Sequence, residues 1–352
     1  DDQEIFNSVN NITLKGDLEE AARKVVFSEV EYACENLASF ENVTLQFSED
    51  AANPTLLTYE EQEPDFTAFA SVKTAGYYKT RSLKASTKVY LSTDGNDENS
   101  GKTAAEAVVT LEKAYELLDE TGGMDTNIIV VCGEITLSSA TLSLPAKAAT
   151  ITGKDGETDY QAVLKNGTGT LSLNGDTKFT DIKLDCGKIA NRIHKMVLDV
   201  TGTVVSAEGC DVEVLGGSYT NVYVYPGNGT GSARISGGLV TYLAAANAGK
   251  FENLNLEISG GGITEVLAGG RWSGATIAKV NVTLKGAPVI TSLDGRGACK
   301  ACAETWLNFC DYTGDFGFTT TEFDHIGVIA AEGENYASPA SLQAAMKACS
   351  GG

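Results

Sequence analysis

The chain has little proline, few basic residues and no long apolar run. Six prolines beside 38 glycines, with 42% of the 352 residues hydrophobic, indicate a glycine-rich chain that folds rather than stays disordered. No stretch reaches the roughly 20 apolar residues that a membrane-spanning helix needs, so we expect no membrane insertion. The chain begins at Asp1 without a methionine or an apolar leader, which is typical of a mature or trimmed protein.

The shortage of basic residues excludes two classes of partner. With 26 Lys and Arg against 47 Asp and Glu, the formal net charge is −21. Such a surface repels nucleic-acid phosphates and anionic lipid headgroups at long range. The partners that remain are a neutral glycan, a cationic ligand or another protein, including a second copy of this chain. The plainer interpretation is that the charge serves solubility alone.

Recognisable catalytic motifs are missing as well. The sequence contains no P-loop, no dinucleotide fingerprint and no Gly-x-Ser-x-Gly elbow. The histidines, His194 and His325, stand alone, and an isolated histidine is far more often structural than catalytic. Glu265 and Asp294 are isolated too, and no convincing spacing brings the other acidic candidates together: Asp176, Asp181, Asp185 and Asp199. The sequence therefore leans against an enzyme and predicts no catalytic residue.

What the sequence does contain is a repeat built on glycine pairs. Gly216-Gly217, Gly237-Gly238 and Gly260-Gly261 are each followed by x-x-Thr-x-Val or x-x-Thr-x-Leu, and 285–293 is a degenerate fourth copy. The offsets, 237 − 216 = 21 and 260 − 237 = 23, suit one coil of a parallel β-helix, with glycine forming sharp positive-φ corners. An antiparallel β-sandwich also has short strands, but it does not require the same corner at near-constant spacing. We therefore predict an all-β parallel solenoid over 88–297.

The segment before the repeats has an ordered pattern of its own. A strand (Val89–Ser92) leads into a polar loop (Thr93–Gly101), a helix (Thr110–Glu120) and a buried strand (Asn127–Cys132). This order resembles the opening of right-handed parallel β-helix proteins of the pectate-lyase-like group. The resemblance implies that the helix covers the open end of the first coil, where core and backbone groups would otherwise be exposed.

The repeats and the segment after them carry a second resemblance. The repeat motif Val-x-Val-x-Gly-Gly-x-x-Thr-x-Val is similar to β-helical repeats of bacterial cell-surface proteins and adhesins. Thr305–Phe309, Tyr312–Gly314 and Phe323–Ile326 look like the last coil of the same proteins. The resemblance covers about residues 88–330 and implies architecture rather than activity, because this scaffold hosts both enzymes and inert stalks.

Two further segments flank the predicted solenoid. Residues 1–87 form an N-terminal extension for capping or assembly, in which Asp17–Glu20 resembles a capping box and Ala21–Leu37 has the apolar stripe of an amphipathic helix. Residues 298–352 form a cysteine-rich closing segment. Ser338-Pro339 is typical of a helix start, and we predict a helix from there to about Cys349.

The eight cysteines suggest an oxidising compartment. Cys186 and Cys210 are 24 residues apart, about one coil, which favours a disulfide over two buried thiols. Cys299, Cys302, Cys310 and Cys349 favour two further disulfides, with a zinc site that includes His325 as the alternative. Cys34 and Cys132 remain, and a disulfide between them would link the N-terminal helix to the first coil.

Candidate ligand-binding residues lie near the glycine corners. Aromatic and arginine side chains at about one-coil spacing offer sugar-ring stacking and hydrogen bonds to hydroxyl groups: Tyr219, Tyr223, Tyr225, Tyr242, Arg271, Trp272 and Arg296. The alternative is an internal aromatic stack that fills the solenoid.

No cofactor is predicted, although one loop has oxygen ligands suited to calcium. Asp94, Asn96 and Asp97 supply these oxygens, but the loop lacks the length and terminal glutamate of an EF-hand. A solvated turn explains the same residues equally well.

Taken together, these patterns favour a secreted or cell-surface structural protein. We expect a rigid β-helical rod for display, adhesion or self-assembly into a surface structure. The alternative is a β-helical protein that binds or degrades a polysaccharide.

Overall fold

The computed structural model describes residues 87–137, 141–246, 248–272, 274–299, 301–314, 316–334 and 336–349, and the backbone of four short strands before them. The chain divides into two compact units, Asp1–Ser86 and Thr87–Gly352.

In the first unit, the described residues are strands. β1 (Lys24–Ser28) pairs in parallel with β3 (Thr44–Ser48), and β2 (Ala33–Cys34) pairs antiparallel with β4 (Tyr78–Lys79). The helix predicted over Ala21–Leu37 was therefore wrong at these positions. The run Lys-Val-Val-Phe-Ser is rich in β-branched and aromatic residues, whose strand preference outweighs the helical stripe. The remainder of that prediction, including the capping box, lies outside the described residues.

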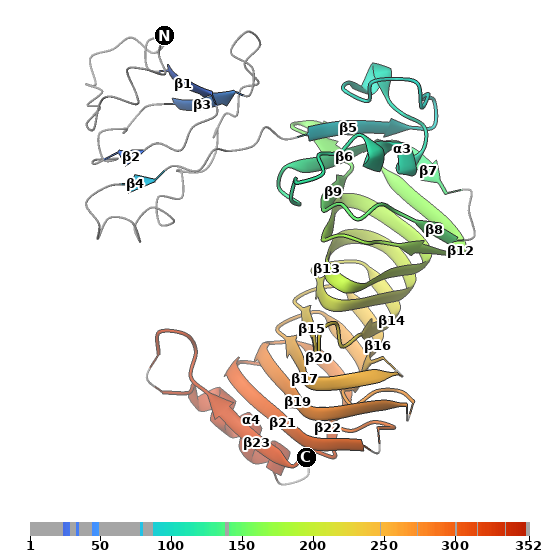
Figure 1. The fold of residues 1–352 in the computed structure, drawn as a ribbon. Coiled ribbons are helices and arrows are strands. Elements are labelled where there is room, and N and C mark those ends of the chain that lie inside the picture. Colours follow the sequence, from blue (N-terminus) through green and yellow to red (C-terminus); the bar gives the residue numbers. More distant parts are fainter. Residues whose placement is uncertain are drawn as a thin grey trace. The chain divides into compact units, whose positions relative to one another are not determined.

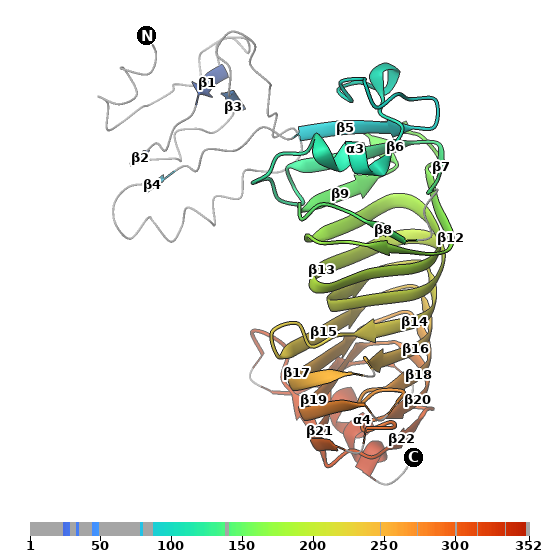
Figure 2. The same ribbon diagram turned by 45° about the vertical axis from the view of Figure 1, so that its right-hand side comes forward.

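The second unit is one parallel β-sheet of 17 strands that curls around an axis as a solenoid (Figures 1 and 2). Its strands are β5 (Thr87–Ser92), β6 (Asn127–Cys132), β7 (Glu134–Thr136), β8 (Thr141–Ser143), β9 (Ala149–Thr152), β12 (Val163–Ser172), β13 (Thr177–Val214), β14 (Ser218–Val224), β15 (Thr230–Ile235), β16 (Leu239–Ala245), β17 (Gly249–Ile258), β18 (Gly262–Leu267), β19 (Ala275–Gly286), β20 (Val289–Asp294), β21 (Ala301–Tyr312), β22 (Thr319–Thr321) and β23 (His325–Ile329). A small antiparallel hairpin, β10 (Lys154–Asp155) and β11 (Thr158–Asp159), interrupts the series.

The pairing register shows how the coils follow one another. Ser218 pairs with Leu239, Leu239 with Gly262, and Gly262 with Val289, so each coil of the repeat stacks on the one before it. The glycine corners have the positive φ expected of them, 84° at Gly217 and 74° at Gly238. Parallel pairing continues through β21 to β23, so the sheet extends past residue 297, where we had placed its end.

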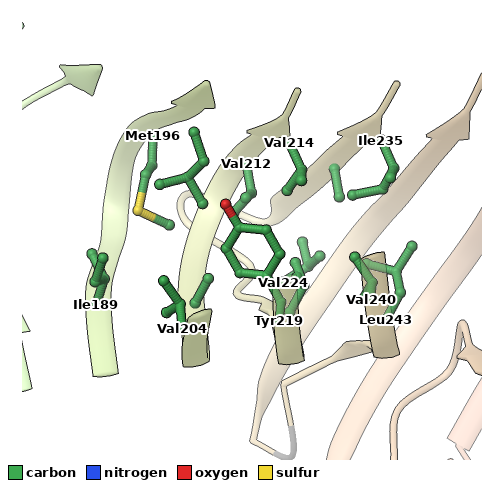
Figure 3. Packing of buried hydrophobic residues seen from close by; sticks show 14 of the residues in the cluster. Ile189, Met196, Val204, Val212, Val214, Tyr219, Val224, Ile235, Val240 and Leu243 are labelled. Atoms are coloured by element: carbon green, nitrogen blue, oxygen red, sulfur yellow. The ribbon is translucent and has the colours of Figure 1, made fainter. Parts of the chain in front are cut away.

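The interior of the solenoid is a single hydrophobic core that extends from Val89 to Ala348. Register partners contribute the same inward position on successive coils, and Val204, Tyr219 and Val240 follow one another in this way (Figure 3). Each fully buried aliphatic side chain contributes about 1.5–3 kcal/mol through removal of apolar surface from water. The stack is therefore stabilised along its whole length rather than at one centre.

Helices lie at both ends of the sheet. Near β5, a 3-10 turn η3 (Ala104–Glu106) precedes α3 (Leu111–Glu116), which buries Leu111, Ala114 and Tyr115 in the core. The helix is shorter than predicted, because Leu117 already serves as its C-cap. At the other end, the predicted C-terminal helix is confirmed as α4 (Pro339–Cys349), which packs against β21 and β23 (Figure 1).

Candidate functional site

Four of the predicted binding residues form one aromatic–arginine cluster on the outside of the solenoid. The Arg271 guanidinium carbon lies 4.1 Å from the ring centroid of Tyr242 and 5.3 Å from that of Trp272. The rings of Tyr223 and Trp272 are 5.6 Å apart. Asn221 joins the cluster because its amide oxygen accepts hydrogen bonds from Tyr223 Oη and Arg271 Nη1.

The pairing of β14 with β16 places this cluster. Asn221 and Tyr242 are register partners, and Arg271 and Trp272 lie beyond the end of β18, so that segment packs back onto earlier coils. Arg271 covers a face of the Tyr242 ring, which leaves Trp272, 46% exposed, as the aromatic surface that a ligand can reach. The cluster therefore holds this segment in place and presents one ring to solvent.

The other three predicted binding residues lie elsewhere. Tyr219 is 2% exposed and belongs to the core, as the internal-stack alternative requires (Figure 3). Arg296 donates to both carboxylate oxygens of Asp324, at 2.9 and 2.7 Å. Tyr225 donates to Glu208 at 3.2 Å, in a separate network. The sequence does not distinguish core positions from surface positions here, because a side chain near a glycine corner can face inward or outward without changing the repeat.

The sequence patterns did not predict the network around Glu208. Glu208 is 4% exposed, and its carboxylate accepts from Arg192 Nε at 3.0 Å and pairs with Lys188 Nζ at 2.8 Å. Burial opposes ionisation of Glu208, but the two cations outweigh it and hold the pKa below its usual range. Burial and the neighbouring carboxylate raise the pKa of Tyr225 to about 12, so its hydroxyl stays protonated. The one feature of the sequence that indicates this contact is the 16-residue spacing of Arg192 and Glu208, which matches one short coil.

Replacement of Glu208 by Gln is expected to destabilise the protein by about 2 kcal/mol at pH 7, because two partly exposed cations lose their charge-assisted hydrogen bonds to a buried carboxylate. Since folding lowers the pKa of Glu208, its contribution is complete above about pH 4.5 and is lost as the pH falls through the folded-state value. Urea unfolding of both proteins from pH 7 to pH 3 should therefore show the difference shrinking in acid. Glu257→Gln, which removes a half-exposed pair with Lys285, is the control and should cost less. A difference independent of pH would contradict the ionised pair.

The calcium-candidate loop is engaged with the first helix. The Asp97 carboxylate accepts from the backbone of Val109 and Thr110, both at 2.9 Å, and from the Thr110 hydroxyl. Asn96 accepts from the Glu98 backbone. Partial burial opposes ionisation of Asp97, but the hydrogen bonds from Thr110 outweigh it, and the pKa of Asp97 is lowered. Among the described residues, no group of three or more His, Cys, Asp or Glu side chains is placed to hold a metal ion.

The disulfide predictions are corrected by the structure. The seven cysteines with described side chains, Cys132, Cys186, Cys210, Cys299, Cys302, Cys310 and Cys349, are all free, and the side chain of Cys34 lies outside the described part. Cys210 contacts the carbonyl of His194, 16 residues back, and Thr203 contacts Asp185, 18 residues back. Coils here are shorter than the 24 residues between Cys186 and Cys210, so these cysteines do not stack.

Three thiols of the C-terminal group lie within hydrogen-bond distance of backbone carbonyls. Cys299 donates to Ala275, Cys302 to Glu304 and Cys310 to Ala330. Inside the solenoid, burial raises the pKa of Cys186 to about 12, which keeps that thiol protonated and unreactive.

Asp181 and Asp199, whose spacing in the sequence predicts no contact, lie in one groove. Thr180 Oγ1 lies 3.3 Å from Asp181 Oδ2 and 3.4 Å from Asp199 Oδ2, so its one hydroxyl proton can be donated to either, and these carboxylates are neighbours on successive coils. Lys154 pairs with Asp181 at 2.8 Å, and all three line an open groove of about 430 Å³. The sequence repeats indicate a coil of 21 to 23 residues, whereas Asp181 and Asp199 are only 18 residues apart, so the spacing did not predict this approach.

A second groove of about 430 Å³ runs across β14, β16, β18 and β20. Its outward side chains include the threonine of each repeat, and all four are exposed: Thr220, Thr241, Thr264 and Thr291. None of the residues that line this groove is charged. We call this surface the threonine face. In the sequence, the repeated Gly-Gly-x-x-Thr motif identifies the threonines of this face.

Comparison with family models, curated proteins and solved structures finds no match to this chain. Of the helices that the structure describes, none has the length and apolarity to cross a membrane.

Proposed function

We propose that this chain is an extracellular structural and adhesive protein, a rigid rod of the right-handed β-helical type found in pectate-lyase-like and adhesin repeats. The supporting observation is the continuity of the solenoid: one core runs from Val89 to Ala348, and parallel ladders join successive coils. Such a stack resists bending because each coil is hydrogen-bonded to its neighbours. A stiff rod suits display of a binding surface away from a cell.

The proposed secreted or surface location rests on the resemblance of the repeat motif to those of cell-surface proteins and on the acidic net charge of the chain. The cysteines no longer support it, since the seven described thiols are free. Antibody labelling of intact cells that produce the protein tests the location directly. Labelling without permeabilisation, and loss of the protein after external protease treatment, are the expected results. Labelling that appears only after lysis would contradict the proposal.

Carbohydrate binding, with or without degradation, is the second candidate, and the exposed Trp272 ring favours it. A panel of neutral and acidic polysaccharides should be assayed for retention and for release of reducing or unsaturated ends. If the cluster binds sugar, Trp272→Ala should lower retention at least tenfold, while Tyr336→Ala, which removes an 86% exposed ring elsewhere, should not. Turnover that is abolished by Asp181→Asn or Asp199→Asn would favour the enzyme and contradict the structural role.

A further inference from the structure

The threonine face combines exposed aliphatic side chains with a complete lack of charge. Leu239 is 63% and Val289 71% exposed, and both line the groove. Their register partners Ser218 and Gly262 line it as well. Exposed apolar groups on a surface without charged residues, in a chain of net charge −21, are typical of an interaction site.

The charge of the chain indicates which partner can reach this face. Two copies that approach through most surfaces bring together like charges, which repel. At the threonine face no lining residue is charged, so contact between two copies there desolvates no charge.

The shape of the face is complementary to itself. Along one column, small and large residues alternate in the order Ser218, Leu239, Gly262 and Val289. A two-fold axis between the second and third positions places Leu239 against Gly262 of a second copy, and Ser218 against its Val289. Every large side chain then meets a small one, as an isologous interface requires.

The threonine column obeys the same symmetry. The residues before and after each threonine are paired between neighbouring strands. These pairs align four threonines on successive coils: Thr220, Thr241, Thr264 and Thr291. The axis pairs Thr241 with Thr264 of the second copy and Thr220 with its Thr291. Each hydroxyl both donates and accepts, so two facing threonines can hydrogen-bond to each other without other polar groups.

We propose that the threonine face binds a second copy of this chain, antiparallel and across a two-fold axis. This inference rests on the proposed structural role and names the surface through which the rods associate. Four rungs span only about 15 Å, because parallel strands lie about 4.8 Å apart. The interface is accordingly of the weak class, and crowding of many copies at a surface raises its occupancy through effective concentration.

Sedimentation velocity of the full chain from about 1 to 200 µM tests the inference. The wild-type protein is expected to shift from monomer to dimer as its concentration rises, and more strongly in 0.5 M than in 0.05 M NaCl, because salt screens the repulsion between acidic copies. Leu239→Lys with Val289→Lys should stay monomeric, and Gly262→Leu, which fills the hollow without adding charge, should weaken dimerisation at least tenfold. Ile193→Lys, a 69% exposed site outside the groove, is the matched control and should behave as wild type.

A cross-link checks the two-fold geometry. In a Cys349→Ser background, Thr241→Cys and Thr264→Cys are made as separate single variants, because the two positions are register neighbours within one chain and would form an intramolecular disulfide. An equimolar mixture of the two variants should form a disulfide-linked dimer on mild oxidation, and the background alone should not. A wild-type protein that stays monomeric at 200 µM, or a double-lysine variant that dimerises as well as wild type, would overturn the inference. Surface labelling would still hold in that event, so the two proposals fail separately.

Discussion

Gly237→Ala is expected to lower the free energy of unfolding by about 3 kcal/mol, the upper end of the usual cost of overpacking. A Cβ at this position would lie 2.1 Å from the carbonyl oxygen of Leu215 on the preceding coil. That neighbour is backbone within the ladder, so it cannot move without shifting two coils. The midpoint of thermal unfolding should fall by roughly 6–12 °C for a unit of this size.

Gly123→Ala is the matched control for this substitution. No atom lies within 4 Å of a Cβ built at Gly123, so its effect should stay within about 0.5 kcal/mol. Calorimetry of the three proteins separates a steric cost at the corner from the general effect of a methyl group. Equal unfolding temperatures for wild type and Gly237→Ala would contradict the close approach of the coils.

Lys147→Met is expected to destabilise the protein by about 3 kcal/mol, because it removes a buried cation that caps a helix. Lys147 is 6% exposed, and its Nζ donates to the carbonyls of Glu116 and Leu118 at 3.0 and 2.8 Å. Glu116 is the last residue of α3 and Leu118 follows its C-cap, and neither carbonyl has a helical donor. Methionine keeps the volume of the side chain, so most of the loss comes from the unpaired carbonyls, at about 1–3 kcal/mol each. The pair of Lys147 with the exposed carboxylate of Glu120, at 2.8 Å, is lost too and adds at most about 1 kcal/mol.

Urea unfolding combined with amide hydrogen exchange tests this cap. Amides of α3 should lose protection in Lys147→Met more than amides of β17 or β19. Lys154→Met, which breaks a half-exposed pair with Asp181, is the control and should cost less than about 1 kcal/mol. If the two variants are equally stable, Lys147 does not hold the first helix in place.

Local sequence patterns sufficed for the elements that depend on neighbouring residues. Thr110 and Pro339 predicted the starts of α3 and α4, and the run Asn127–Cys132 predicted β6 to the residue. The helix predicted over Ala21–Leu37 failed because β-branched residues on its apolar stripe fit a strand at least as well.

By itself, the sequence determined that glycine corners recur at near-constant spacing and that alternating residues between them face one core. Those two facts require a stack of coils, because corner conformation and alternation are local properties of the chain. Only the tertiary structure decided which residues of different coils meet. Coil length varies along the stack, so Cys186 and Cys210 miss each other while Arg192 reaches Glu208 and Asp181 approaches Asp199. Contact across coils depends on the summed length of every turn between them, which no local pattern encodes.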